Sequence, residues 1–526
     1  MKKAYYKYLS LLILALPAAF IINSCTKKLD QQNPNQQTVE TFWQSQDDAI
    51  KGVNAIYSTL IEDGTFMRMT PCLLDARGDD VHSNSPWPVL GNMGRFSLGT
   101  GDPGGYGWAF SDYYEGVNRA NQVLAKVPDI NMDADLKTRL LGQAYFLRGL
   151  YFYYLVDLFG QVALPLQTAT STADFHVPQS TAEQGWEQVI SDFKQAVDML
   201  PASYSNVNGP DKGQTGRATK GAAMAFLGKA YLFNKLYDDA ATQFKSVIDL
   251  NVYSLVPNYA DNFNEAGKNN SESIFEIQFS RSVGGTDASW GGEPSPSWGK
   301  TEGRAVTYGA RSFGFTDMQP TQSLLQEFEI EKTKDGKEDP RLNVTLYHNG
   351  PGVMLYGKLF ADVYANSPND LNDVFTAKYE NGDGTYPDEF AIIWRSAVNQ
   401  RIMRLADVYL MYAECLNETG KTQEAYAYIQ KVRDRVNLPD LATTKPNMSQ
   451  AQMRDQLAHE RLLELAFEGH RFDDIRRWGW LQDPNKLALL KQRDPEYNNY
   501  QPGRELYPIP QSEIDNNPGF QQNQSY

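Results

Sequence analysis

Two stretches of this sequence share the spacing of small and apolar residues that is typical of a tetratricopeptide helix pair. The small positions are Gly228 and Ala240 within residues 217–248, and Ala413 and Ala425 within residues 404–432, and both pairs are 12 residues apart. Small residues at these positions allow two antiparallel helices to cross at close range. Because the spacing occurs twice, the sequence predicts a scaffold built from helical repeats.

Other segments are consistent with this scaffold. Apolar residues recur at helical spacing over residues 47–61, 113–127, 140–159 and 186–200. The third of these is apolar on most faces, which predicts a buried helix. Clusters of β-branched and aromatic residues predict short strands at 273–279 and 391–395. We therefore expect an all-α fold of tetratricopeptide-like repeats with long irregular loops and a few short strands.

Two long segments lack helical periodicity. They cover residues 64–110 and 281–320 and are rich in Gly, Pro, Asp and aromatic residues. Connections of this length in a compact domain are usually functional or disordered. Their aromatic content argues against disorder, so we expect two ordered, irregular loops with a functional role.

Charge and cysteine content restrict the classes of partner. The chain has 49 basic and 64 acidic residues, a formal net charge of −15. This charge repels phosphate backbones, and we expect no nucleic-acid partner. Cys25, Cys72 and Cys415 are the only cysteines, and none belongs to a C-x-x-C pair of the kind that binds zinc.

The beginning of the chain resembles a lipoprotein signal. Three lysines precede an apolar stretch at residues 11–22, which is too short to span a bilayer, and the tetrapeptide INSC at residues 22–25 resembles a bacterial lipobox. We expect residues 1–24 to be a signal peptide, Cys25 to be lipidated, and residues 25–40 to form a polar spacer. The acyl anchor would then be the only membrane attachment. The alternative is an ordinary signal peptide with a chance cysteine.

A search for catalytic motifs finds none that is complete. His459-Glu460 begins the zinc-binding motif H-E-x-x-H, but Leu463 replaces its second histidine. Glu460, Glu464 and Glu468 share one helical face and could be considered as the carboxylates of a glycoside hydrolase. A group of arginines close in sequence favours instead an ion-pair lattice that fixes helix ends: Arg461, Arg471, Arg476 and Arg477. We therefore expect no catalytic residue, no metal site and no cofactor.

The two irregular segments carry the candidate ligand-binding residues. Sugar rings stack their C–H faces on Trp and Tyr, and their hydroxyl groups bond to Asp, Asn and Arg. The first segment supplies Arg77, Asp80, Asn84, Trp87 and Trp108, and the second supplies Asp287, Trp290, Trp298, Arg304 and Tyr308. Any one tryptophan could simply fill a gap in a loop-rich surface. Taken together, the two segments favour a ligand-binding surface.

Several longer motifs resemble the SusD/RagB family of outer-membrane lipoproteins. In the C-terminal half they are RLADVYLMYAECLNETGKTQEAYAYIQKVRDRVNLP (404–439), ERLLELAFEGHRFDDIRRWG (460–479) and LYPIPQSEIDNNPGFQQNQSY (506–526). In the N-terminal half, AYFLRGLYFYYLVDLFGQVALP (144–165) and ESIFEIQF (272–279) are also similar to that family. The resemblance covers nearly the whole mature chain.

The resemblance implies a non-catalytic lipoprotein of the outer membrane that faces the exterior of the cell. It implies a SusD-like helical region at 41–270 and a RagB/SusD-like region at 271–526, packed together as one body. It further implies that the protein captures oligo- or polysaccharide as the lid of a SusC-like TonB-dependent transporter, with the irregular loops supplying the stacking surface. No cofactor is implied, and a structural calcium ion is left open.

Other interpretations stay compatible with the sequence. The same lid could capture peptides, since the resemblance determines architecture better than ligand, or the repeats could be a scaffold for protein partners. Thr26-Lys27-Lys28 follow the cysteine, where many surface-exposed lipoproteins of this kind carry acidic residues. The residues after Cys25 therefore leave open which side of the membrane the protein faces.

Overall fold

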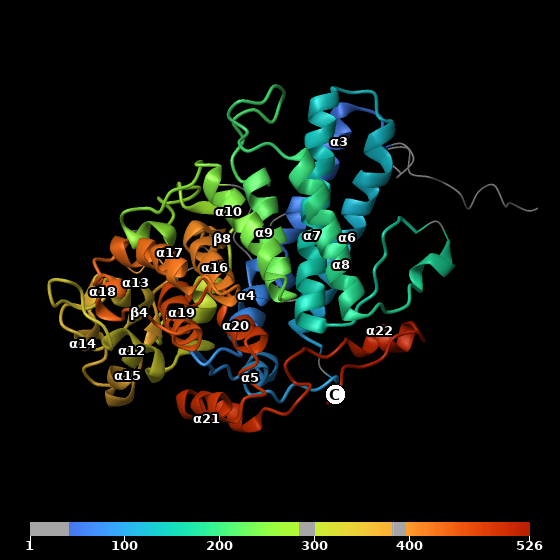
Figure 1. Cartoon of the computed structure of the whole chain (residues 1–526). Coiled ribbons are helices and arrows are strands. Elements are labelled where there is room, and N and C mark those ends of the chain that lie inside the picture. Colours follow the sequence, from blue (N-terminus) through green and yellow to red (C-terminus); the bar gives the residue numbers. More distant parts are fainter. Residues whose placement is uncertain (1–41, 102, 170, 283–299, 381, 383–395) are drawn as a thin grey trace, which may run out of the picture.

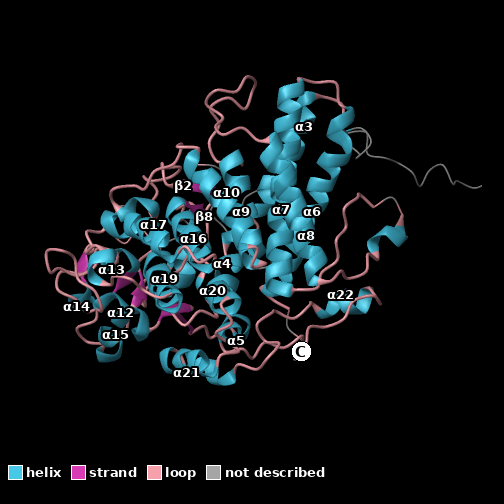
Figure 2. Cartoon of the chain, viewed as in Figure 1, coloured by secondary structure: helices cyan, strands magenta, loops and turns pink. Residues whose placement is uncertain are grey.

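The computed structural model describes residues 42–526, apart from 102, 170, 283–299, 381 and 383–395. Helices dominate the described part of the chain and the strands are short (Figure 2). The predicted all-α class is confirmed. None of the helices described is both long and apolar enough to cross a membrane. The strand predicted at 391–395 falls outside the described residues.

Four long helices form one side of the molecule (Figure 1). They are α3 (Gln46–Ser58), α6 (Tyr106–Lys126), α7 (Ala134–Phe159) and α8 (Ala182–Met199), and each packs against a neighbour in this group. Nearly all of α7 after its first turn is buried, as its apolar faces predicted. Gly149 of α7 lies against α8, where a Cβ atom would be 3.1 Å from the Cβ of Asp192. The absence of a side chain at Gly149 therefore allows the two helices to approach closely.

Both predicted helix pairs are confirmed. The first consists of α9 (Lys220–Phe233) and α10 (Tyr237–Asp249), and the second of α16 (Leu405–Glu418) and α17 (Thr422–Arg435). At Gly228 a Cβ atom would lie 2.7 Å from the ring of Phe244, so this glycine permits the crossing of α9 and α10. Because α10 packs against α16, pairs that are distant in sequence are neighbours in one helical array.

The remaining elements are shorter. The other helices are α4 (Met69–Asp75), α5 (Pro88–Gly94), α11 (Arg304–Tyr308), α12 (Gln322–Glu329), α13 (Leu342–Thr345), α14 (Phe360–Val363), α15 (Pro368–Asn372), α18 (Leu441–Thr444), α19 (Gln450–Leu465), α20 (Arg471–Arg477), α21 (Pro484–Arg493) and α22 (Gln511–Asn516). Single turns lie at η1 (Thr59–Ile61), η2 (Asp63–Met67), η3 (Val127–Asp129), η4 (Thr172–Phe175), η5 (Tyr259–Asn262) and η6 (Pro495–Asn499). Most of the described residues in the interior belong to one large apolar core that extends from Ala49 to Phe520.

The described strands pair into two-stranded antiparallel sheets. They are β1 (Val81–Ser83) with β3 (Met318–Pro320), β2 (Ser273–Ile277) with β8 (Gln400–Arg404), β4 (Leu346–Tyr347) with β7 (Phe375–Thr376), and β5 (Met354–Leu355) with β6 (Lys358–Leu359). The strand predicted at 273–279 is confirmed as β2. Its partner β8 leads directly into α16, so this sheet places the second helix pair beside the first.

Glu460, Glu464 and Glu468 lie in a buried ion-pair lattice, as predicted, but the prediction of their partners is wrong. The nearby arginines pair elsewhere, Arg461 with Asp407 and Arg477 with Glu414, for example, and the glutamates pair with basic residues from more distant parts of the chain. Arg341 contacts Glu460 at 2.7 Å and Glu464 at 3.1 Å, while Arg404 contacts Glu464 at 2.5 Å and Glu468 at 2.7 Å. Burial raises the pKa of Glu464, but Arg435, Arg404 and Arg341 together hold it well below its usual value. These ion pairs therefore hold β8, α19 and the segment before α13 together. The role of the three carboxylates is structural and not catalytic.

The end of α7 is closed by residues from far along the chain. Gly160 follows the helix with φ +73°, a left-handed conformation that glycine adopts without strain. The carbonyl of Leu158 accepts a hydrogen bond from the backbone N–H of Tyr507 at 2.8 Å, and the carbonyl of Phe159 accepts one from the Asn523 amide at 2.9 Å. These bonds satisfy carbonyl groups that a helix end otherwise leaves unpaired.

Candidate functional site

The prediction that residues 64–110 form an irregular loop is wrong. This segment contains α4, β1, α5 and the start of α6, and α4 is buried throughout. Likewise, the described part of the second segment contains α11 and β3, and β3 pairs with β1. These elements are only three to seven residues long, apart from α6, so they are too short to show a clear helical period in the sequence.

The structure brings two of the predicted residues, Trp87 and Trp108, together at the surface. Both side chains are half-buried, and their ring centroids are 5.8 Å apart with the planes inclined by 37°. The guanidinium carbon of Arg68 lies 5.8 Å from the Trp87 ring and 5.7 Å from the Trp108 ring. Arg68 is itself buried and pairs with Asp63, its Nε donating to the carboxylate at 2.7 Å. We name Trp87, Trp108 and Arg68 the tryptophan platform.

Local sequence explains how both rings are positioned. Trp87 immediately precedes α5, where Pro88 occupies the first helical position, and its backbone N–H donates to the Ser85 hydroxyl at 3.1 Å. Trp108 lies in the first turn of α6, which begins after Gly105 with φ +71°. Two helix starts, fixed by a proline and a glycine, therefore hold the rings against each other.

Beside the platform, Asp112 and Gly64 form a support that the sequence analysis missed. Asp112 lies one helical turn after Trp108 and accepts a hydrogen bond from the backbone N–H of Gly64 at 2.9 Å. Burial, together with the charge of nearby Glu62, raises the pKa of Asp112 to about 8. The spacing of four residues between Trp108 and Asp112 was the signal available in the sequence.

Four other predicted ligand residues lie in the interior. They are Arg77, Asp80, Arg304 and Tyr308, each at most 4% exposed. Arg77 donates to the carbonyls of Met93 and Leu506, at 3.2 and 3.1 Å. Arg304 and Tyr308 both donate to the Asp75 carboxylate, at 3.2 and 2.9 Å. Burial, with neighbouring Asp79, raises the pKa of Asp80 to about 8. These environments favour structural roles for all four residues.

The remaining predicted residues are divided between the surface and the part of the chain that is not described. Asn84 is exposed at the end of β1, and its amide donates to the Gln319 side chain at 3.1 Å. Asp287, Trp290, Trp298 and the lipidation residue Cys25 lie outside the described residues. Their roles stay predictions.

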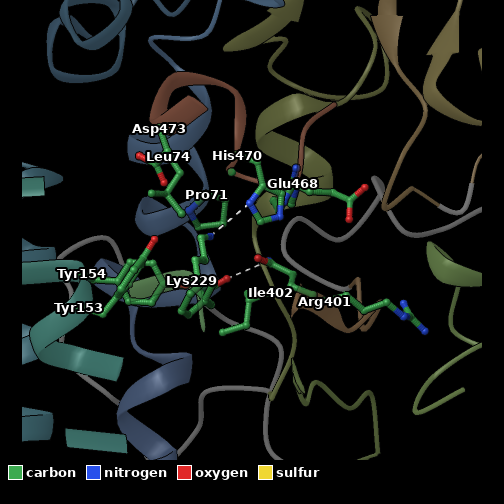
Figure 3. Close-up of a pocket in the computed structure, with 14 residues that line it drawn as sticks. Pro71, Leu74, Tyr153, Tyr154, Lys229, Arg401, Ile402, Glu468, His470 and Asp473 are labelled. Carbon is green, nitrogen blue, oxygen red and sulfur yellow. Dashed lines mark hydrogen bonds between the residues drawn. The ribbon is translucent and has the colours of Figure 1, made fainter. Parts of the chain in front are cut away.

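A separate cavity lies in the interior between α4, α7, α9 and the start of α20 (Figure 3). Its water-accessible volume is about 20 Å³, and its lining includes Tyr153, Lys229 and His470. The Lys229 ammonium and His470 Nδ1 are 3.3 Å apart. Burial, followed by the charge of Lys229, lowers the pKa of His470 well below its usual value. A volume of this size holds a water molecule but not a sugar ring, so the surface platform is the better candidate site.

Comparison with known proteins decides the family. A sequence profile of the SusD family matches residues 271–526, and a second profile, described as starch-binding and associating with the outer membrane, matches residues 100–232. The chain belongs to the SusD family. Members of this family bind glycans without catalysing a reaction, which agrees with the expectation of a binding protein and not an enzyme.

Individual SusD-like proteins are similar over most of their length. A SusD-like protein of Formosa agariphila is 26% identical over 524 residues, 94% of each chain. The starch-binding protein SusD of Bacteroides thetaiotaomicron is 24% identical, covering 74% of this chain and 73% of its own. Among solved structures, a SusD superfamily protein from Bacteroides vulgatus has a TM-score of 0.80 at 27% identity, covering 92% of this chain and 100% of that one. A laminarin-binding SusD-like protein has a TM-score of 0.71 at 25% identity, covering the same shares of the two chains.

Proposed function

We propose that this SusD-family protein captures oligo- or polysaccharide at the tryptophan platform and delivers it to a SusC-like TonB-dependent transporter, for which it acts as the lid. The observation that carries the proposal is the pair of half-exposed tryptophan rings held 5.8 Å apart over a buried arginine. Adjacent aromatic rings at a surface offer stacking faces for sugar C–H groups. Relatives named for binding starch and laminarin support glycan as the ligand class.

The membrane arrangement is part of the same proposal. A lipidated Cys25 would tether the body to the outer membrane, and the residues that follow would act as a spacer. The family profile associated with the outer membrane supports this location. We further propose that the platform faces the cell exterior, so that glycan is bound before it reaches the transporter.

Calorimetry on the whole chain in detergent tests the ligand. Maltohexaose, laminarihexaose, xylohexaose and a mixture of oligopeptides would be titrated into the wild type and into a Trp87→Ala/Trp108→Ala variant. We expect one hexasaccharide to bind and its affinity to fall at least about tenfold in the variant, which is 1.4 kcal/mol. Tyr428→Ala is the matched control, because Tyr428 is also a half-buried aromatic residue that contacts a second ring. Its ring centroid lies 4.6 Å from that of Tyr412.

The outcomes separate the alternatives. Unchanged glycan affinity in the tryptophan variant would contradict the platform as the site. Binding of peptides in place of glycans would favour the peptide-capturing lid. The transporter is tested separately, by purifying the tagged chain from outer membranes after cross-linking. Failure to recover a TonB-dependent barrel protein would contradict the proposal that this protein acts as the lid of such a transporter.

A further inference from the structure

A histidine of β1 meets two carboxylates at the place where α21 is followed by η6. His82 is the middle residue of β1, Asp494 comes directly after α21, and Glu496 lies in η6. One nitrogen of His82 and one oxygen from each carboxylate all lie within 4.8 Å of one another. Imidazole nitrogens and carboxylate oxygens are both metal ligands. The fold therefore brings together three potential metal ligands from segments that are far apart in the chain.

Hydrogen bonds hold the two carboxylates in position. The Asp494 carboxylate accepts a hydrogen bond from the backbone N–H of Glu496 at 3.0 Å. The Glu496 carboxylate accepts one from the backbone N–H of Ser83 at 3.4 Å and one from Arg95 Nε at 3.2 Å. Arg95 also donates to the carbonyl of Ser83 at 3.3 Å. Because Ser83 follows His82 in β1, these bonds fix the carboxylates relative to the histidine, as a preorganised site requires.

Burial of the carboxylates creates a need for a cation. The side chains of Asp494 and Glu496 are 3% and 7% exposed, whereas that of His82 is 41% exposed. A buried carboxylate without a compensating cation is strongly destabilising. Glu496 pairs with Arg95, but His82 is the only basic side chain within 4.0 Å of the Asp494 carboxylate among the described residues. The site therefore calls for a positive charge at the imidazole, on the side that solvent reaches.

The spacing of the ligand atoms fits a metal ion. His82 Nδ1 lies 3.6 Å from an oxygen of Asp494 and 3.6 Å from an oxygen of Glu496. Both distances are longer than a hydrogen bond, which has about 2.7–3.2 Å between donor and acceptor. A tetrahedral zinc ion with bonds of about 2.0–2.2 Å holds its ligand atoms about 3.3–3.6 Å apart. Calcium and magnesium take oxygen ligands, so the imidazole favours zinc.

Two other cations compete for the same ligands. Arg95 occupies one oxygen of Glu496, but its side chain is 43% exposed and has room to turn towards solvent. The contact with Asp494, with the charge of Glu496, raises the pKa of His82 above its usual value, although burial opposes this. A metal ion must therefore displace a proton from the ring, and its affinity should rise with pH.

We propose that His82, Asp494 and Glu496 bind one zinc ion, whose remaining position is filled by water from the exposed side of His82. The ion would link β1 to the junction of α21 and η6 and so stabilise the fold. This site replaces the sequence-based expectation that the protein has no metal site. It does not depend on glycan binding, so it can be judged separately from the proposed function.

Calorimetry at pH 7.5 on the whole chain, in detergent and without a histidine tag, tests the site. Zinc chloride, calcium chloride and magnesium chloride are titrated separately after treatment with a chelator. We expect one zinc ion per chain, with an affinity that falls at least about tenfold in His82→Gln. His459→Gln is the matched control and should change the affinity less than about twofold. His459 also faces a carboxylate, with Nδ1 2.7 Å from Glu327, but it belongs to no such group of three among the described residues.

Two further measurements report on the ion itself. Cobalt in place of zinc gives intense visible absorption when its coordination is tetrahedral, and we expect this absorption in the wild type and not in His82→Gln. An ion that binds only the folded state stabilises it. Zinc should therefore raise the unfolding temperature of the wild type and leave that of His82→Gln unchanged.

Each result decides the proposal. If zinc does not bind, or binds equally well to His82→Gln, the proposal is overturned and the cluster is an ion pair of a protonated histidine. Tighter binding of calcium than of zinc would overturn the choice of metal. Asp494→Asn should also weaken zinc binding, but it alters a buried side chain. His82→Gln, at the surface, decides if that variant fails to fold.

Discussion

Gly64 lies where a side chain would displace the tryptophan platform. A Cβ atom there would be 2.4 Å from the carbonyl carbon of Trp108 and 2.5 Å from an oxygen of Asp112. Packed interiors do not absorb such an overlap without movement. We expect Gly64→Ala to shift the start of α6 and to lower the affinity for the best-binding hexasaccharide about tenfold, measured by calorimetry.

Gly99→Ala is the control for this substitution. A Cβ atom at Gly99 meets no other atom within 4 Å, so the affinity should not change. Equal affinities for Gly64→Ala and the wild type would show that the position of Trp108 does not matter for binding.

Asp112 should make stability depend on pH. Its pKa is raised to about 8, chiefly by burial, whereas an Asp in the unfolded chain titrates near about 3.9. Between these values the folded state holds a proton that the unfolded state lacks, so the free energy of unfolding falls as the pH rises. We expect Asp112→Asn to lose less stability between pH 5 and pH 8 than the wild type, measured by urea denaturation.

The comparison for Asp112 is Asp198→Asn, which changes an exposed Asp on α8. Its stability difference between the two pH values should equal that of the wild type. If Asp112→Asn shows the wild-type difference as well, the carboxyl group is ionised in the folded protein and its described environment is wrong.

At the scale of elements, the buried lattice around Arg341 connects segments that are far apart in the chain. Arg341 is fully buried and contacts Asp339, Glu460 and Glu464. Removing one member of a buried ion pair leaves an uncompensated charge, which costs about 3–5 kcal/mol. We expect Arg341→Met to lower the free energy of unfolding by that amount, measured by chemical denaturation.

An exposed ion pair provides the control for the lattice. Lys245 and Asp249 are one turn apart on α10 and both are exposed, so Lys245→Met should leave the stability nearly unchanged. A second test adds Asp339→Asn to Arg341→Met, because Asp339 pairs with Arg341 at 2.7 Å and would be left as a buried unpaired charge, and this change should restore part of the loss. Equal stabilities for Arg341→Met and the wild type would contradict a structural role for the lattice.

The sequence predicted the elements that depend on residues close together in the chain. It did not predict features that depend on contacts between distant residues. The repeat pairs were predictable because Gly228 and Ala240 lie within one helix pair. The burial of Arg77 and Arg304 was not, since their partners Leu506 and Phe467 are 429 and 163 residues away. Trp87 and Trp108 are close in sequence but belong to the starts of two different helices, so their pairing became visible only once α5 and α6 were placed.

For the whole molecule, the net charge of −15 should select against anionic polysaccharides. Repulsion between exposed charges is screened over about 10 Å at 0.1 M salt. We expect any binding of an anionic polysaccharide to strengthen when sodium chloride is raised from 20 to about 300 mM, while the affinity for a neutral hexasaccharide changes less than about twofold. Affinity electrophoresis at the two concentrations measures both.

A neutral glycan whose binding depends strongly on salt would argue against this electrostatic selection. It would also indicate that a charged group, such as Arg68 after release from Asp63, contacts the ligand directly. Dextran sulfate and unmodified dextran form a matched pair of polymers for this comparison, because they share a backbone and differ in charge.

The hydrogen bonds that cap the end of α7 have a consequence for when the protein can fold during its synthesis. The hydrogen bond from Asn523 to the carbonyl of Phe159 spans 364 residues, and Tyr507, Ile509 and Phe520 also belong to the main core, so the ribosome has released nearly all the described chain before this end of α7 and its core are complete. Contacts of such long range form late and slowly. An emerging chain therefore stays without a finished core for most of its synthesis, the condition in which a polypeptide can still be threaded across a membrane before it folds on the other side.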